Sequence, residues 1–234
     1  LRNHGFGPHD RFLSFLPLAH AYEHTAGLHL PITLGAEVWY CESTEKLQQY
    51  LGEVRPTLAT AVPRLYDLLY ARILSQVKQA RGLKSWLFHQ AVTIGHKRID
   101  GSPLHIGERL LDPILDRLIR ARVRARFGGR IQFFISGGAP LNPAVGRFFT
   151  SLGIGILQGY GQTEASPLIS VNTPDAVKLH TVGRPFANVE IRLADDGELL
   201  VRGDMVMAGY WQDPVATAAA LRDGWLHTGD LATI

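Results

Sequence analysis

The sequence predicts an α/β fold, with a mainly parallel sheet flanked by helices and followed by a small antiparallel β-subdomain. In the first two thirds of the 234-residue chain, short apolar runs alternate with segments of helical apolar spacing, a pattern typical of a parallel sheet. The run 131–135 leads directly into Gly137 and Gly138 and then into a helical segment, the order found at the ligand-binding edge of such a sheet. Beyond about residue 175, apolar and polar residues alternate around tight turns, which indicates antiparallel strands.

The first half of the expected sheet begins near the N-terminus. The apolar run 11–17 predicts a buried strand that ends at a proline, and the spacing of 20–34 predicts a helix that ends at a glycine. A second strand at 38–40 and a short helix at 46–54 come next. A third strand at 57–62, closed by Pro63, precedes a helix whose apolar face includes Leu65, Leu68, Leu69, Ile73 and Val77.

The second half of the α/β region is more helical. Residues 83–127 have helical spacing throughout, broken near 101–103, and a row of arginines in its last part is expected to form a solvated basic face. The strand 131–135, the helix 143–152 and the buried run 152–157 complete this region. Alternation at 189–193 and 198–202 predicts a β-hairpin, followed by a helix at 214–221 and a final strand. We therefore expect an α/β subdomain at 1–174 and a β-rich subdomain at 175–234.

Composition restricts the class of protein. The hydrophobic fraction is 46%, as in globular proteins, while a net charge of +3 and a pI near 9.1 permit anionic partners without requiring them. A single cysteine, Cys41, excludes an internal disulfide and indicates a reducing compartment. Because no run of about 18 apolar residues occurs, we expect no membrane-spanning helix and a cytoplasmic location.

A hydroxyl and a carboxylate, Thr163 and Glu164, stand side by side after the run 152–157. The segment that contains them consists of Gln158, Gly159, Tyr160, Gly161, Gln162, Thr163 and Glu164. Glycines let a backbone approach a ligand closely, and a magnesium ion bound with a nucleotide takes only one or two protein oxygens. The segment therefore predicts a site for a magnesium-bound phosphate.

The segment also resembles the YGxTE motif of the acyl-adenylate-forming (AMP-binding) enzymes, the family of acyl-CoA synthetases, luciferases and peptide adenylation domains. Two further segments resemble that family's motifs in the same order, one at 136–141 and one at 224–230. The resemblance covers about residues 11–234. The long helical region 63–126 is most similar to the long-chain fatty acyl-CoA synthetases.

The resemblance implies a role for each motif. Thr163 and Glu164 would be catalytic residues and would form the Mg²⁺ site, with Thr163 contacting the phosphate and Glu164 the metal ion. His20, the third implied catalytic residue, would border the carboxylate of the acyl substrate. Asp230 would accept hydrogen bonds from the ribose hydroxyls, as acidic residues do in dinucleotide-binding folds. The implied nucleotide-binding residues are Gly137, Gly138, Ala139, Pro140, Gln158, Gly159, Tyr160, Gly161 and Asp230.

The implied reaction has two steps. A fatty acid attacks ATP to give an acyl-adenylate and pyrophosphate, and the thiol of coenzyme A then displaces AMP, with Mg²⁺ and basic groups neutralising charge. The family's lysine-ended phosphate loop has no counterpart in residues 1–10, and its C-terminal lysine-bearing domain would begin after residue 234. We therefore expect a central fragment of a long-chain fatty acid–CoA ligase that is inactive alone. Missing sheet neighbours would expose apolar edges and favour a homodimer.

Several alternatives stay open. The chain could belong to another adenylate-forming acid–thiol ligase, or to a module that binds nucleotide or lipid without catalysis. The arginines of 117–130 are compatible with peripheral contact at an anionic membrane, from which a long-chain substrate would come. A nucleic-acid partner is not expected, because Asp112 and Asp116 interrupt the basic run and no nucleic-acid motif accompanies it.

Overall fold

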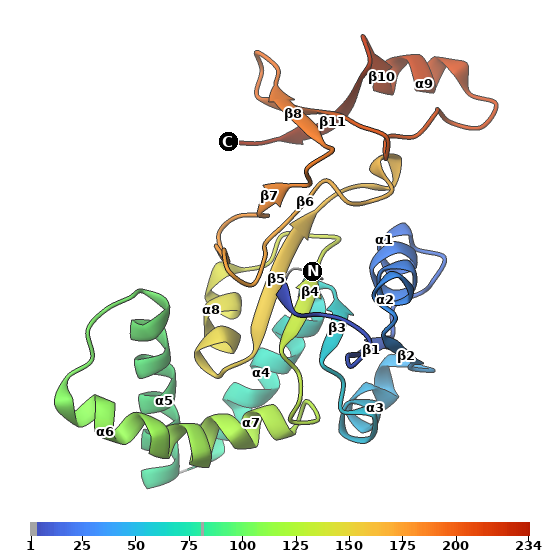
Figure 1. The fold of residues 1–234 in the computed structure, drawn as a ribbon. Coiled ribbons are helices and arrows are strands. Elements are labelled where there is room, and N and C mark those ends of the chain that lie inside the picture. The colour runs from blue at the N-terminus through green and yellow to red at the C-terminus, as the bar shows by residue number, and fades with distance from the viewer. Residues whose placement is uncertain (1–3, 81) are drawn as a thin grey trace.

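Two sheets organise the protein in the computed structural model, which describes residues 4–80 and 82–234 (Figure 1). The larger sheet has the strand order β2-β1-β3-β4-β5-β6-β7; its first five strands pair in parallel, and β6 and β7 are added antiparallel. Its strands are β1 (Arg11–Ser14), β2 (Glu37–Tyr40), β3 (Leu58–Ala61), β4 (Phe133–Ser136), β5 (Gly155–Tyr160), β6 (Ser170–Val171) and β7 (Arg184–Pro185). The predicted α/β class is confirmed.

The helices lie where the apolar spacing predicts them, with two π-helical turns that the spacing does not predict. The elements before β4 are α1 (Ala21–Glu23), the π-helical turn His24–His29, α2 (Leu30–Leu34), the 3₁₀ turn Thr44–Lys46, α3 (Leu47–Val54), α4 (Pro63–Gln79), α5 (Leu83–Ile99), α6 (Ile106–Leu115), the π-helical turn Asp116–Arg120 and α7 (Ala121–Ala125). After β4 come α8 (Pro143–Ser151), the 3₁₀ turn Thr163–Ala165 and α9 (Pro214–Ala220). Among the helices of the described ranges, none is long and apolar enough to cross a membrane.

Helices cover both faces of the parallel strands. On one face α3, α4, α5, α7 and α8 pack on the sheet around Tyr66, Phe134, Phe149 and Ile156. On the other face α1 and α2 pack around Phe12, Tyr22 and Leu58. Full burial of each such side chain contributes about 1.5–3 kcal/mol, so the core fixes the carboxyl ends of β4 and β5 in place.

The smaller sheet has the order β10-β11-β9-β8 and is antiparallel throughout. It comprises β8 (Glu190–Leu193), β9 (Glu198–Arg202), β10 (Leu221–Arg222) and β11 (Trp225–Leu231). The predicted hairpin at 189–202 is present, and the turn before β11 uses Asp223 and Gly224 with φ of +52° and +77°. β7 lies at residues 184–185, beyond the predicted subdomain boundary at residue 174, but it pairs with β6 in the larger sheet. The predicted boundary at residue 174 therefore stays a prediction.

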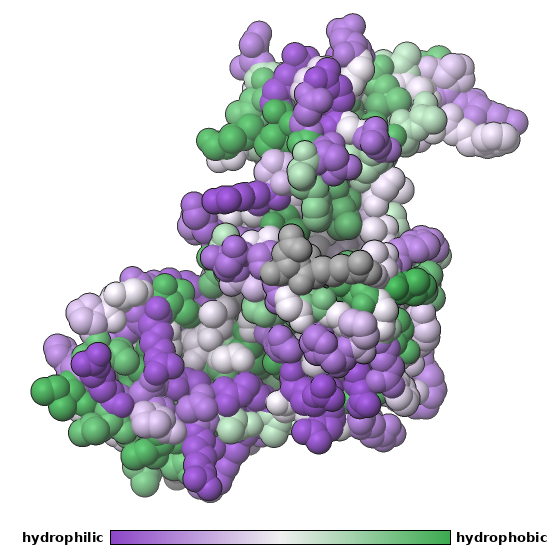
Figure 2. All heavy atoms as spheres, viewed as in Figure 1, coloured by the Kyte–Doolittle hydropathy of each residue, from purple (hydrophilic) through white to green (hydrophobic). Residues whose placement is uncertain are grey.

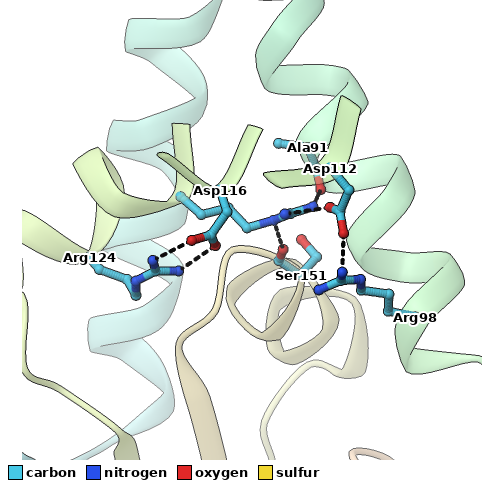
Figure 3. A network of polar contacts seen from close by, with 7 residues as sticks. Ala91, Arg98, Asp112, Asp116, Arg124 and Ser151 are labelled. Carbon is cyan, nitrogen blue, oxygen red and sulfur yellow. Dashed lines mark hydrogen bonds and ion pairs between the residues drawn. The ribbon is translucent and has the colours of Figure 1, made fainter. Parts of the chain in front are cut away.

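The expectation of a fully solvated arginine face is wrong at Arg120, which is only 4% exposed. Figure 3 shows its surroundings: Nη1 donates to Asp112 Oδ1 at 2.7 Å, Nη2 to the carbonyl oxygen of Ala91 at 2.9 Å, and Nε to that of Ser151 at 3.1 Å. A regular helical period could not predict this, because the π-helical turn Asp116–Arg120 changes the angle between successive side chains. Arg120 therefore ties three helical segments together instead of facing water.

Candidate functional site

A cavity of about 270 Å³ lies at the carboxyl ends of β4 and β5. Its walls are residues 135–138, 159–164, 167–168 and 170–171, together with His20 and Tyr22. β5 runs to Tyr160, three residues beyond the expected end of the strand, so the first half of the motif 158–164 is strand and the second half is a turn. The motifs 136–141 and 158–164, which start 22 residues apart in the sequence, therefore both contribute to the cavity lining, because β4 and β5 are neighbours.

The structure brings most of the predicted site residues together. Those that line the cavity are His20, Gly137, Gly138, Gly159, Tyr160, Gly161, Thr163 and Glu164. Ala139 and Pro140 follow directly in the turn, outside the lining. Gln158 points into the protein: its Oε1 accepts from the backbone N–H of Leu141 at 2.8 Å, and its Nε2 donates to the carbonyl oxygen of Thr181 at 3.0 Å. Its side chain thus holds neighbouring loops.

The motif glycines are required by the packing of the chain against itself. A Cβ atom at Gly161 would overlap the carbonyl oxygen of Pro167, and one at Gly159 would lie 2.9 Å from the carbonyl oxygen of Ser170. A Cβ at Gly137 would press on the ring of Tyr22. The expected reason for these glycines was close approach of a ligand, whereas the geometry gives close approach of the protein's own backbone and side chains.

Glu164 is held by a loop that comes from the smaller sheet. The hydroxyl of Tyr210 donates to Glu164 Oε1 at 2.8 Å, and the N–H of Met207 donates to the Glu164 carbonyl oxygen at 2.8 Å. The Ser166 hydroxyl donates back to Met205 at 2.8 Å. The hydrogen bond to Glu164 raises the pKa of Tyr210 above its usual value. Sequence reasoning missed Tyr210, because nothing in its local pattern links it to a motif 46 residues away.

Asp230 lies next to the cavity through Tyr160, whose hydroxyl donates to Asp230 Oδ2 at 2.6 Å. Burial, followed by the hydrogen bond to Asp230, holds the pKa of Tyr160 well above its usual value, so the hydroxyl remains a donor at neutral pH. Asp230 is placed by β11, where Glu198 on β9 accepts hydrogen bonds from His227 Nδ1 and the N–H of Gly229. The predicted motif 224–230, in the smaller sheet, therefore contacts the motif 158–164, in the larger sheet, through the Tyr160–Asp230 hydrogen bond.

His20 and Tyr22, at the start of α1, also line the cavity. His20 caps α1, with Nδ1 accepting from the N–H of Tyr22 at 3.2 Å. The hydroxyl of Tyr22 donates to the carbonyl oxygen of Ile135 at 2.7 Å, which fixes α1 on the end of β4. Tyr22 was not predicted as a site residue, since an aromatic residue in an apolar helical pattern is most simply a core residue.

Thr163 and Glu164 offer a hydroxyl and a carboxylate to a cation at this cavity, and Glu164 is the one acidic side chain among the described residues that line it. Within residues 4–80 and 82–234, no group of three or more histidine, cysteine or acidic side chains is arranged to hold a metal ion. Nor do the described residues supply an ion-pair partner for the carboxylate of Glu164. One carboxylate with a neighbouring hydroxyl fits Mg²⁺, which keeps several waters and takes further oxygens from substrate phosphates. The donor set does not fit a cation that needs an all-protein cage.

A family model described as "AMP-binding enzyme" matches residues 1–211. The chain belongs to the AMP-binding enzyme family. The relatives of this member include the long-chain-fatty-acid–CoA ligase FadD15 of Mycobacterium bovis, 34% identical over 96% of the chain and 38% of the relative. They also include the peroxisomal long chain acyl-CoA synthetase 6 of Arabidopsis thaliana, 36% identical over 95% of the chain and 33% of the relative. The chain thus spans between a third and two fifths of these curated relatives.

Solved structures of other proteins share the fold of this AMP-binding family member. The N-terminal domain of FACL13 from Mycobacterium tuberculosis superposes with a TM-score of 0.67 at 20% identity, over 97% of this chain and 49% of that one. A benzoate CoA ligase from Burkholderia xenovorans superposes with a TM-score of 0.66 at 25% identity, over 97% of this chain and 39% of that one. The predicted family and fold are both confirmed.

Proposed function

We propose that the chain is the central part of an ATP-dependent long-chain fatty acid–CoA ligase. Such an enzyme joins a fatty acid to AMP with release of pyrophosphate and then transfers the acyl group to coenzyme A. Membership of the AMP-binding family and relatives named as long-chain ligases at 34–36% identity support this proposal. The long helical region between β3 and β4 supports the long-chain substrate class.

The observation on which the proposal depends most is the meeting of three distant motifs at one cavity. In our assignment the adenine lies against the backbone of Gly137 and Gly138 and beside the ring of Tyr160. Asp230, held by the Tyr160 hydroxyl, accepts hydrogen bonds from the ribose. Since Asp230 can accept at two oxygens and the tyrosine occupies one site on Oδ2, capacity remains for both ribose hydroxyls.

The charged part of the nucleotide is assigned to the turn Thr163–Ala165. Thr163 is exposed at the cavity and offers its hydroxyl to a phosphate, while Glu164 offers its carboxylate to Mg²⁺. The metal ion would neutralise charge on the phosphates during transfer of the adenylyl group. His20, which also lines the cavity, is assigned to the side where the carboxylate of the fatty acid enters.

Nucleotide binding can be tested on the 234-residue chain by calorimetric titration with AMP. We expect Asp230→Ala to weaken AMP binding at least about tenfold, because hydrogen bonds to a charged group contribute about 1.5–3 kcal/mol. Asp195→Ala is the matched control, since Asp195 is also an exposed aspartate but lies in the turn between β8 and β9, whereas Asp230 accepts a hydrogen bond from the cavity residue Tyr160. Equal affinities for the wild type and Asp230→Ala would refute the assignment of the ribose site.

The reaction itself is tested on the complete protein in which this chain occurs. Pyrophosphate release should depend on ATP and a long-chain fatty acid, and Glu164→Gln should lower the rate at least about a hundredfold. The 234-residue chain alone is expected to release no pyrophosphate. Preference for an aromatic acid over fatty acids would indicate another adenylate-forming acid–thiol ligase, and AMP binding without pyrophosphate release would indicate a non-catalytic module.

A further inference from the structure

An apolar stripe faces solvent along α6 and the π-helical turn that follows it. Ile106, Leu110, Ile114 and Leu118 recur every four residues and are 79%, 70%, 51% and 38% exposed. Side chains at this spacing lie on one side of a helix, which is normally the side that packs on a core. Figure 2 shows hydrophobic atoms gathered over α6 at the lower left, beside hydrophilic atoms. We call these four residues the α6 stripe.

The acidic side chains of the same segment all make ion pairs with cations of this chain. Glu108 accepts from Lys97 at 2.5 Å. The buried Asp112 pairs with Arg120 and Arg98, and Asp116 pairs with Arg124 (Figure 3). These ion pairs neutralise the negative charges of the segment. They also fix the rotation of α6, so that Asp112 faces the protein interior and the stripe faces outward.

The arginines that remain on the outer side are not neutralised. Arg109, Arg117 and Arg122 are exposed, and none of them has a carboxylate partner among the residues that the structure describes. The surface therefore combines an apolar stripe with three free positive charges. This combination complements the edge of an anionic bilayer, where an apolar face enters the acyl region and cations meet phosphate groups. A nucleic acid would match the charges but leave the apolar stripe in water.

We propose that the α6 stripe, with Arg109, Arg117 and Arg122, docks on the surface of an anionic lipid bilayer. The helix lies in the interface and does not cross it, in keeping with its ten residues. In Figure 1, α6 lies at the end of the molecule opposite the smaller sheet. The proposal uses no residue of the nucleotide cavity, so it stands or falls separately from the proposed function.

The test is flotation of the protein with lipid vesicles, using the complete protein and the 234-residue chain in parallel. Wild-type protein should float with vesicles that contain phosphatidylglycerol, bind pure phosphatidylcholine vesicles much less, and be released by salt. The double variant Leu110→Asp/Ile114→Asp should lose at least about tenfold in partitioning, because it removes apolar contact and adds charge repulsion. Arg109→Gln/Arg117→Gln should lose about tenfold on anionic vesicles only.

Val215→Asp is the matched control, because Val215 is 80% exposed on α9, away from the stripe. It should float like the wild type. All variants alter exposed side chains, and unchanged circular dichroism and urea midpoints confirm that they fold. The proposal is overturned if wild-type protein stays with the soluble fraction, or if the stripe variant floats as well as the wild type. It is also overturned if light scattering shows a dimer that only the stripe variant dissociates, since a second copy would then cover the stripe.

Discussion

At the scale of single residues, two carboxylates are held in place by other parts of the chain, Glu164 in the cavity wall and Asp230 beside the cavity. Glu164 accepts a hydrogen bond from the hydroxyl of Tyr210, and Asp230 accepts one from the hydroxyl of Tyr160. A tyrosine donates one hydrogen bond and leaves the negative charge unneutralised. Each carboxylate is therefore oriented and still able to bind a cation or a hydroxyl group.

Tyr210→Phe should therefore raise the Mg²⁺ concentration that half-saturates pyrophosphate release by the complete protein, by about three- to tenfold, because loss of one hydrogen bond leaves Glu164 free to rotate. The maximal rate should change less. Tyr50→Phe is the matched control, since the Tyr50 hydroxyl donates to Glu42 at 2.9 Å far from the cavity. An unchanged Mg²⁺ requirement in Tyr210→Phe would show that Glu164 needs no such positioning.

A second residue-scale prediction concerns Glu23, which is fully buried and accepts from the hydroxyl of Ser14 at 2.5 Å. Burial raises the pKa of Glu23 above its usual value. The folded protein therefore binds this proton more tightly than the unfolded chain, so the stabilisation is complete below about pH 4.3 and is lost as pH rises through the folded pKa.

Glu23→Gln removes this titration. The free energy of unfolding of the wild type, taken relative to Glu23→Gln, should fall as pH rises through that window. Urea denaturation of both proteins at several pH values measures the difference. A constant difference across the series would contradict the raised pKa.

At the scale of secondary-structure elements, Arg120 joins the turn after α6 to α5 and α8. It bonds to Asp112 and to the carbonyl oxygens of Ala91 and Ser151, all of them out of contact with water. A buried charge costs little only while its partners are present. One guanidinium group thus links these helical segments by hydrogen bonds, in addition to their apolar packing.

Arg120→Ala should lower the free energy of unfolding by about 3 kcal/mol, because it removes the buried ion-pair partner of Asp112 and one donor to each of two buried carbonyl oxygens. Arg124→Ala, which breaks the half-exposed pair with Asp116, should cost less than about 1 kcal/mol. Urea denaturation of the two variants gives the comparison. Equal costs would mean that the Arg120 network is as weak as a surface ion pair.

Apolar spacing predicted most elements of the fold, because strands and helices differ in period and each buries one face. It failed at Arg120 because a π-helical turn breaks the period. For the site, sequence motifs located both strand ends, Glu164 and Asp230. Tyr22 and Tyr210 were not predicted as site residues, because their contacts with Ile135 and Glu164 form only when distant segments fold together.

At the scale of the whole molecule, the two sheets share a core at the motif turn. Ala165 and Ile169, which flank the turn, pack with Val189, Val201 and Leu226 of the smaller sheet. The Tyr160–Asp230 and Tyr210–Glu164 hydrogen bonds cross the same boundary. Neither sheet can separate without exposing this cluster.

The two sheets should therefore unfold together. In a variant that keeps Trp225 alone, with Trp39, Trp86 and Trp211 replaced by phenylalanine, fluorescence follows the smaller sheet, where Trp225 lies between Arg192 and Arg202. Its urea transition should coincide with that of the helices, measured by far-ultraviolet circular dichroism. A fluorescence transition at clearly lower urea would show that the smaller sheet melts independently.

The contact between Gly161 and Pro167 bears on how diverged members of this family are to be judged. A chain that kept the fold but lost catalysis would still need glycine at this position, because any side chain would collide with the carbonyl oxygen of Pro167. The same chain could exchange Thr163 or Glu164 freely, since neither is fully buried. A surviving glycine pattern is thus a sign of the shared fold, whereas under the proposed function Thr163 and Glu164 are the residues whose loss would mark a member without catalysis.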